Sequence, residues 1–385
     1  MRRKTLKISL ITSSYAPNLG GVEEHVRNVA AELSRRGHEV FVWTVADGAD
    51  RPAFVDGIRV RSLPTPLPTR SMRGLLTFAA HLPRAVFAWA SAFWRDRPDL
   101  LHIHCFGPNG TYALVLKAVT RRPMVLSAHG ETLADQDSVF EISDLQRHAL
   151  RRALHDAEAV TGCSEVVLED LRARFSLGKG SGRVVHNGID LGETTAPNSV
   201  LARSGPYVAA LGRMVPMKGF DVLLRSFAAI DRDDVRLVLA GDGPARGELE
   251  SLARELDIRT RVDFPGRLDR ADVRRLIAGA EVLVVPSRVE PFGIVILEGW
   301  REGTPVVATD VGGPPEFVHD GLDGVLVDPT NVPHLAAALS RLLSNPQEAR
   351  RIGAAGRRRL ESDFGWSHTV DDYERVYEVA RQSGG

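Results

Sequence analysis

The chain has 385 residues, of which 43% are hydrophobic and 25% are charged, and its formal net charge is zero. This length predicts two domains, each large enough to bury its own core. The neutral charge and ordinary composition exclude a disordered chain and give no electrostatic support for a nucleic-acid partner. Cys105 and Cys163 form neither a metal-binding spacing nor a disulfide framework, so we expect a reducing, cytoplasmic location.

Strands and helices are expected to alternate along the first half of the chain. The basic N-terminus leads into a short apolar run, which we assign to a first strand and not to a signal peptide. The expected helices include Val22–Arg35 and Ser164–Phe175. Nearly continuous apolar strands between helices predict a parallel sheet covered on both faces. The expected strands are Lys7–Thr12, Glu39–Thr44, Ile58–Ser62, Leu100–His104, Met124–Ala128, Ala159–Gly162 and Arg183–His186.

The apolar stretch Leu75–Trp94 resembles a membrane span in its length. His81, Pro83 and Arg84 lie at its centre, where a bilayer would penalise them. We expect a core helix, kinked at Pro83. The alternative is an amphipathic surface within residues 70–97, flanked by arginines, that makes peripheral contact with a membrane.

The second half restarts the alternation after a break. Residues 187–206 are rich in glycine, proline, asparagine and serine and predict a linker. The expected helices after it are Phe220–Ala229, Val332–Leu343, Gln347–Leu360 and Thr369–Arg381. The expected strands are Tyr207–Gly212, Val235–Ala240, Val262–Phe264, Val282–Val285, Val306–Ala308 and Gly324–Val327.

The sequence therefore predicts two Rossmann-like, doubly wound α/β domains, one over residues 1–195 and one over residues 206–365. Ligands of such sheets bind outside the carboxyl ends of the strands. We expect two such edges to face each other across a cleft.

The segment Glu290–Glu298 carries the strongest chemical signal. It follows an expected strand, and Gly293 is expected to open a helix. A helix N-terminus at the carboxyl end of a strand binds anions. Carboxylates on either side of it can accept hydrogen bonds from hydroxyl groups, which suits a ligand with phosphates in its middle and sugars at both ends. Either glutamate could also be an ordinary surface residue.

Cations and glycines follow three other strands. Arg213 and Lys218 lie on one strand-to-helix connection, where a cation pair would neutralise a diphosphate. Gly20 and Gly21 follow the first strand and allow a close backbone approach to a ligand. His129 ends the strand Met124–Ala128 and could donate a hydrogen bond to a sugar hydroxyl. The chain lacks the dinucleotide and P-loop patterns at these positions.

Taken together, these segments resemble the retaining GT-B glycosyltransferases of family 4, also called glycosyl transferases group 1. The shared motifs stand in family order and span about residues 8–329. One small departure is Pro314-Pro315 within the glycine-glycine-x-proline-glutamate signature. The motifs are Gly20-Gly-Val-Glu23, Ala128-His-Gly130, His186-Asn-Gly-Ile-Asp190, Gly212-Arg213 with Lys218-Gly219, Ala240-Gly-Asp-Gly-Pro244, Glu290 with Glu298, and Thr309-Asp-Val-Gly-Gly-Pro-Pro-Glu316.

The resemblance implies a donor site built largely by the C-terminal domain. Arg213 and Lys218 would hold the donor diphosphate, Glu298 the ribose hydroxyls, and Glu290 the donor sugar. Backbone N–H groups at the helix start would contact sugar and phosphate, and the segment after the strand Val262–Phe264 would contact the base. The remaining donor-binding residues are Phe292, Gly293, Ile294, Val295, Arg267 and Leu268.

The N-terminal domain would complete that site. The resemblance implies that Gly21 approaches the β-phosphate and that Gly20 is also donor-binding. It also implies that His129 contacts the donor sugar, with His129 and Glu290 as the catalytic residues. In the family, the donor's own phosphate is thought to take the proton from the acceptor hydroxyl. This transfer takes place on the same face of the sugar as the leaving group. The C-terminal helix, residues 366–385, would pack back on this domain. No metal and no cofactor beyond the nucleotide-sugar co-substrate are implied.

Metal-binding patterns are weak in this sequence. Asp135-Gln-Asp137 and Asp231-Arg-Asp233 resemble the metal motif of a different glycosyltransferase fold, but neither ends a strand, so we expect surface loops. His102 and His104 alternate onto one strand face. No third ligand has a suitable spacing, and we expect both to lie in the core or at a cleft edge.

The expected reaction is transfer of a hexose-type sugar to a hydroxyl acceptor. A UDP-sugar is the favoured donor and GDP-mannose the second. The acceptor is a lipid, a polysaccharide or a small metabolite. Open alternatives are a nucleotide-sugar 2-epimerase, a phosphorylase-like enzyme, and a non-catalytic nucleotide-sugar-binding protein.

Overall fold

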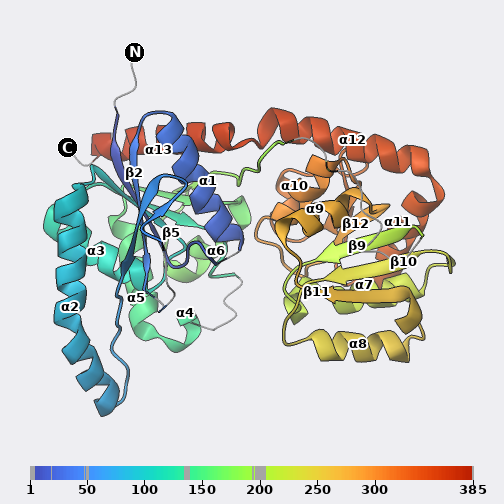
Figure 1. The fold of residues 1–385 in the computed structure, drawn as a ribbon, viewed down its shortest axis with the longest axis horizontal. Coiled ribbons are helices and arrows are strands. Elements are labelled where there is room, and N and C mark those ends of the chain that lie inside the picture. The colour runs from blue at the N-terminus through green and yellow to red at the C-terminus, as the bar shows by residue number, and fades with distance from the viewer. Residues whose placement is uncertain are drawn as a thin grey trace. The chain divides into compact units, whose positions relative to one another are not determined.

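The structure is a computed structural model that describes residues 5–18, 20–46, 48, 52–133, 139–192, 195 and 205–383. The chain divides into two compact units, shown in Figure 1. The first unit is residues 1–188 with 366–385, and the second is residues 189–365. Residues 193, 194 and 196–204 of the predicted linker lie outside the described residues.

The first unit is built around an eight-stranded sheet in the order β3-β4-β2-β1-β5-β6-β7-β8. Neighbouring strands are parallel except β3 and β4, which form an antiparallel pair. The central strand β1 places Ile8 opposite Val40 of β2 and Leu100 of β5. The strands are β1 Lys7–Thr12, β2 Glu39–Val45, β3 Phe54–Val55, β4 Ile58–Leu63, β5 Leu100–His104, β6 Met124–Ala128, β7 Ala159–Gly162 and β8 Arg183–Val184.

Helices cover this sheet, and the C-terminal helix is one of them. Val26 and Val29 of α1 share a buried core with Val370 and Tyr377 of α13, so the end of the chain completes the core begun at its start. The helices are α1 Gly21–Arg35, α2 Met72–Asp96, α3 Pro108–Thr120, α4 Val139–Ile142, α5 Asp144–Asp156, α6 Glu165–Phe175 and α13 Trp366–Ser383.

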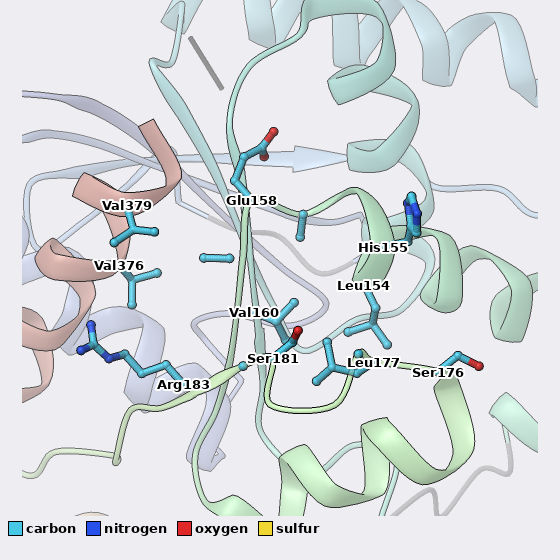
Figure 2. Close-up of a pocket in the computed structure, with 14 residues that line it drawn as sticks. Leu154, His155, Glu158, Val160, Ser176, Leu177, Ser181, Arg183, Val376 and Val379 are labelled. Carbon is cyan, nitrogen blue, oxygen red and sulfur yellow. The ribbon is translucent and has the colours of Figure 1, made fainter. Parts of the chain in front are cut away.

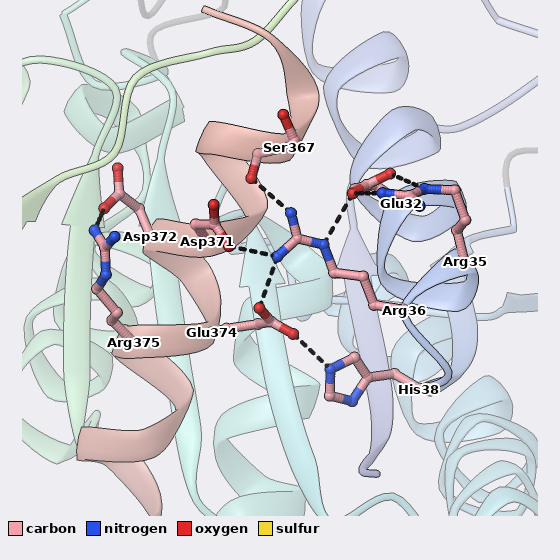
Figure 3. A network of polar contacts seen from close by, with 9 residues as sticks. All are labelled: Glu32, Arg35, Arg36, His38, Ser367, Asp371, Asp372, Glu374 and Arg375. Atoms are coloured by element: carbon pink, nitrogen blue, oxygen red, sulfur yellow. Dashed lines mark hydrogen bonds and ion pairs between the residues drawn. The ribbon is translucent and has the colours of Figure 1, made fainter. Parts of the chain in front are cut away.

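A polar network ties α13 to the end of α1 (Figure 3). The Arg36 guanidinium donates to Glu32 at 2.9 Å, to Asp371 at 2.6 Å and to Glu374 at 2.7 Å. The backbone N–H of Leu6 donates to His38 Nδ1, so His38 Nε2 carries the proton and donates to Glu374 at 3.0 Å. Glu374 is only 5% exposed, and its buried charge is compensated by hydrogen bonds from Arg36 and His38.

The second unit contains a six-stranded parallel sheet in the order β11-β10-β9-β12-β13-β14. Its strands are β9 Tyr207–Leu211, β10 Arg236–Ala240, β11 Val262–Gly266, β12 Val282–Val285, β13 Val306–Thr309 and β14 Val325–Val327. Its helical segments are η1 Pro216–Lys218, α7 Phe220–Ala228, α8 Arg246–Glu255, η2 Arg259–Arg261, α9 Arg270–Ala278, α10 Ile294–Glu302, η3 Pro314–Glu316, α11 Val332–Ser344 and α12 Pro346–Asp363. The predicted architecture of two parallel-sheet α/β domains is confirmed.

Helix α2 differs from the predicted core helix. Its buried residues all lie in its second half, where Trp89 and Phe93 pack inward, whereas Leu76 is 68% and Phe87 74% exposed. The first half has no buried residue because it extends past the sheet (Figure 1). Among the described residues, no helix combines the length and hydropathy needed to cross a membrane.

Candidate active site

The strand order of the second unit places two of the predicted motifs side by side. Strands β9 and β12 are neighbours, with Leu283 opposite Ala209. The strand that follows β9 in the chain, β10, lies on one side of this pair, and the strand that follows β12, β13, lies on the other. A crevice forms at the carboxyl ends of strands at such a switch in strand order. The connection from Gly212 to Gly219 leaves β9 at this point, and the connection from Pro286 to Gly293 leaves β12.

An ion pair joins these two connections. Lys218 Nζ lies 2.7 Å from Glu290 Oε2, and the Ser287 hydroxyl donates to the same oxygen at 2.7 Å. Glu290 is 7% exposed, whereas the Lys218 side chain is 27% exposed. The pair lines a cavity of ≈ 70 Å³ together with Gly293, Ile294 and Val295. Sequence reasoning predicted all of these residues except Ser287, because a serine in a loop gives no distinctive signal.

The backbone of Glu290 is fixed by the glycine-rich segment after β13. Gly313 N–H donates to the Glu290 carbonyl oxygen at 2.8 Å, and Gly312 forms a β-bridge with Glu290. Gly312 has a φ of +103°, and a Cβ there would lie 2.2 Å from the Glu290 oxygen. Only glycine fits this approach, so this motif positions the Glu290 loop.

Helix α10 starts at the cavity wall. Gly293 is its N-cap residue, with a φ of +96°, and no side chain caps the helix there. The Ile296 N–H donates to the Gly293 carbonyl oxygen at 2.9 Å, whereas the N–H groups that precede it in the helix have no acceptor within the helix. Ile294 and Val295 line the cavity at this end of the helix, as does Lys218, and helix N-termini favour anions in general.

Other predicted donor residues do not line this cavity. Arg213 is exposed on the β9 connection, Glu298 is half-buried in α10, and Arg267 and Leu268 follow the edge strand β11. Phe292 is 3% exposed and stacks on Phe317 with ring centroids 4.9 Å apart. The Phe292 side chain therefore packs in the core.

The Ala240–Pro244 segment supports the Arg213 loop. Met214 N–H donates to the Asp242 carbonyl oxygen at 2.9 Å, and a Cβ on Gly241 would lie 1.9 Å from the Gly212 oxygen. These glycines thus allow two loops to pack together. Asp233, in one of the two predicted acidic surface loops, has a fully exposed side chain; residues 135–137 lie outside the described residues.

The first unit gathers its predicted residues at the carboxyl edge of its own sheet. Gly20 caps α1 after β1, and a Cβ on Gly21 would meet no atom within 4 Å. His129 follows β6, and its backbone N–H donates to Glu131 at 2.7 Å. Burial lowers the pKa of His129 to about 4, so the ring is neutral near pH 7 and offers one donor and one acceptor nitrogen.

Three further histidines lie in the same region as His129, and the sequence did not predict this cluster. His25 of α1 and His104 of β5 contact the His129 ring, while His102 lies deeper and bonds Tyr377 and Ser127 at 2.8 and 2.7 Å. His102 and His104 are fully buried, as expected for core residues. The spacing of histidines in the sequence did not reveal this group, because His25, His104 and His129 come from distant parts of the chain.

A separate cavity of ≈ 670 Å³ lies elsewhere in the first unit (Figure 2). Glu158, Val160 and Arg183 line it together with Val376 and Val379 of α13. These residues lie around the amino-terminal ends of β7 and β8 and not the carboxyl edge that carries His129. Ligands of parallel sheets bind at the carboxyl edge, so we do not assign this larger cavity as the active site.

Two family models together cover most of the chain. The model for Glycosyltransferase Family 4 matches residues 19–193, and that for glycosyl transferases group 1 matches residues 193–359. A GDP-mannose-dependent phosphatidylinositol monomannoside mannosyltransferase of Mycolicibacterium smegmatis is 30% identical over 93% of this chain and 94% of its own length. The chain belongs to glycosyltransferase family 4. It is a glycosyltransferase that uses nucleotide sugars, as predicted.

Other members and solved structures agree with this assignment. A D-inositol 3-phosphate glycosyltransferase of Mycobacterium leprae is 32% identical over 91% of this chain and 86% of its own. The sucrose-phosphate synthase of Thermosynechococcus elongatus is 25% identical and superposes with a TM-score of 0.80 over 98% of this chain and 99% of its own. Anabaena HepE, solved with UDP, has a TM-score of 0.77 at 22% identity over 97% and 100% of the two chains, which shows the shared fold. The family members support transfer over the epimerase, phosphorylase and sensor alternatives.

Proposed function

We propose that this family 4 glycosyltransferase is a retaining, metal-independent enzyme that moves a hexose-type sugar from a UDP-sugar to a hydroxyl acceptor. The observation that carries the proposal is the Lys218–Glu290 pair at the start of α10, where two connections meet beside β9 and β12. A diphosphate placed there would meet an ammonium group and the N–H groups of a helix N-terminus. Glu290 would then accept hydrogen bonds from the sugar.

The residues also have the chemistry that the leaving group needs. Negative charge grows on the nucleotide diphosphate as the glycosidic bond breaks, and fixed donors aimed at that charge lower the barrier. Lys218 and the first turn of α10 would supply these donors, with Arg213 on the same connection as Lys218. His129, neutral and half-buried in the first unit, would hydrogen-bond the donor sugar. Glu298 would hold the ribose.

The donor base is tested by thermal unfolding with UDP, GDP, ADP and their sugar conjugates. A ligand at 100 times its dissociation constant should add about 2.7 kcal/mol to stability. We expect a shift with uridine nucleotides that Glu298→Ala reduces and that Glu255→Ala, at an exposed position of α8, leaves unchanged. A shift with guanosine nucleotides alone would assign GDP-mannose as the donor type. No shift with any nucleotide would refute the site.

We also propose that α2 makes peripheral contact with the membrane that holds a lipid acceptor. The exposed apolar residues of α2 include Leu76, Phe87 and Trp94, the last 68% exposed, and residues 70–97 carry five arginines. An apolar face with flanking cations binds anionic bilayer surfaces. The mannosyltransferase relative from Mycolicibacterium smegmatis is named for a phosphatidylinositol-based acceptor.

Sedimentation with anionic liposomes tests this contact. We expect binding at low salt that rising salt weakens and that Phe87→Ser with Trp94→Ser abolishes. Val119→Ser, which removes a single exposed apolar side chain of α3, is the matched control and should bind like the unmodified protein. Equal binding by the double variant, or none at low salt, would refute the proposal.

A further inference from the structure

Three histidines from separate segments gather at the carboxyl edge of the first unit's sheet. His25 lies in the second turn of α1, His104 ends β5, and His129 follows β6. One ring nitrogen of each lies within 4.8 Å of a ring nitrogen of each of the others. His25 and His104 are buried, and His129 is half-buried.

The spacing of these nitrogens suits a shared metal ion. His104 Nδ1 and His129 Nε2 share a hydrogen bond of 3.2 Å, and a bound ion would replace the proton between them. Two imidazole nitrogens bound to one Zn²⁺ at about 2.0–2.1 Å, at the tetrahedral angle, would lie about 3.3 Å apart. The His25 nitrogen lies within 4.8 Å of both, and its ring would move closer to share the ion.

His25 also holds a fully buried nitrogen atom, Nδ1, that makes no hydrogen bond of ordinary geometry, and the Asn187 side chain is a polar neighbour of this ring. His104 would bind the ion through Nδ1, the atom that faces His129. Buried polar atoms without a partner are uncommon in folded proteins, and a bound ion can supply the missing partner. The Tyr373 hydroxyl lies 2.9 Å from His25 Nε2, a contact that would hold the ring with Nδ1 ready to donate its lone pair.

The fourth histidine of the group, His102, differs from the other three in its hydrogen bonds. His102 has both ring nitrogens in hydrogen bonds, to the Tyr377 and Ser127 hydroxyls. It is therefore satisfied as a core residue and has no lone pair to offer. The three rings that could share an ion are the three that face one another at the sheet edge.

We propose that His25, His104 and His129 form a site for a first-row divalent transition metal, best suited to Zn²⁺. Three neutral imidazoles bind Zn²⁺, Cu²⁺ or Ni²⁺ in preference to Mg²⁺ or Ca²⁺, which favour oxygen ligands. Half-buried His129 provides the path of entry, and a water molecule completes the fourth position. This ion is not part of the proposed transfer reaction.

The site has a consequence for activity that rests on the proposed function. We assign His129 to the donor sugar, and a ring whose Nε2 binds a metal cannot use that nitrogen for a sugar hydroxyl. Zn²⁺ should therefore slow sugar transfer without preventing nucleotide binding, and a chelator should restore the rate. The metal site would in this way regulate the enzyme.

Metal uptake tests the inference without relying on activity. EDTA-treated protein without an affinity tag is titrated with Zn²⁺ by calorimetry and with Co²⁺ by visible absorption. We expect one ion per chain, with the intense visible band of four-coordinate Co²⁺. His129→Gln and His25→Gln should each weaken Zn²⁺ affinity at least about tenfold. His148→Gln, which removes an exposed histidine of α5, should bind Zn²⁺ like the unmodified protein.

The outcomes separate this inference from the proposed function. Absence of metal uptake by the unmodified protein, or equal uptake by His129→Gln, would overturn the metal site. The Co²⁺ spectrum of the unmodified protein decides the matter even if His25→Gln fails to fold. Nucleotide binding measured without metal tests the donor site independently, so either proposal can fail while the other stands.

Discussion

At the residue scale, the two glycines that start α1 have different surroundings. A Cβ on Gly20 would lie 2.4 Å from the Glu23 carboxylate, whereas a Cβ on Gly21 would meet nothing within 4 Å. Gly21 is the first residue of the helix and has no left-handed φ. The fold therefore gives no reason for glycine at position 21, and the proposed approach to the donor β-phosphate gives one.

Gly21→Ala separates these two reasons. Alanine should leave stability unchanged or raise it by about 0.4–1 kcal/mol, because it restricts the unfolded chain. Its methyl group should weaken UDP binding by about tenfold, or 1.4 kcal/mol. Calorimetry measures the binding and urea denaturation the stability. Gly247→Ala, at an equally open position of α8, is the control; if both variants bind UDP normally, Gly21 has no part in the site.

At the scale of elements, α13 is held to α1 by Arg36. The Arg36 side chain is 15% exposed and bonds Glu32, Asp371 and Glu374. Apolar packing of Val370 and Tyr377 adds to this attachment. Removal of the guanidinium would leave several carboxylates partly buried without their main partner, which is the costly way to break an ion pair.

Arg36→Ala should accordingly destabilise the protein by about 3 kcal/mol. Arg375→Ala, in the same helix region, removes an exposed pair with Asp372 whose side chains are 59% and 36% exposed, and should cost no more than about 0.5 kcal/mol. Both arginines are drawn in Figure 3. Urea denaturation compares them, and equal effects would show that the network does not hold α13.

The same network predicts a dependence on pH. The hydrogen bond from Arg35 lowers the pKa of Glu32 below its ordinary value of 4.5, with Arg36 contributing in the same direction. Since the folded state then binds the proton less readily than the unfolded state, this stabilisation is complete above pH 4.5 and is lost as pH falls through the lowered pKa. Glu32→Gln should be less stable at neutral pH and lose less stability on acidification. Parallel curves for the two proteins would contradict this.

At the scale of the whole molecule, two parallel sheets and every described strand except the short β3 were predicted from the sequence, whereas α3, α5, α8 and α9 were not named. Strands such as Val282–Val285 are apolar on both faces and end at glycine- or proline-containing turns, so local patterns identify them. The prediction of a core helix was wrong for the first half of α2, because apolar residues occur in both halves and only the tertiary structure shows that Leu76 and Phe87 remain exposed.

The candidate site was predictable only in part, because local sequence patterns do not show which strands are neighbours in a sheet. The strand ends that carry Lys218 and Glu290 are visible in the sequence, but their direct pairing depends on β9 and β12 being adjacent. Ser287 and the positioning role of Gly312 also follow from contacts across the sheet edge. The histidine cluster joins α1, β5 and β6, and no local pattern connects residues 25, 104 and 129.

The central claim is that Lys218 and its surroundings hold the diphosphate of a nucleotide sugar. Titration calorimetry with UDP on the unmodified protein, Lys218→Ala and Lys179→Ala tests it most directly, because Lys179 is an exposed lysine of the first unit. The account predicts UDP binding that Lys218→Ala weakens at least about tenfold, or 1.4 kcal/mol, and that Lys179→Ala preserves. Equal UDP affinity in Lys218→Ala and the unmodified protein would contradict it.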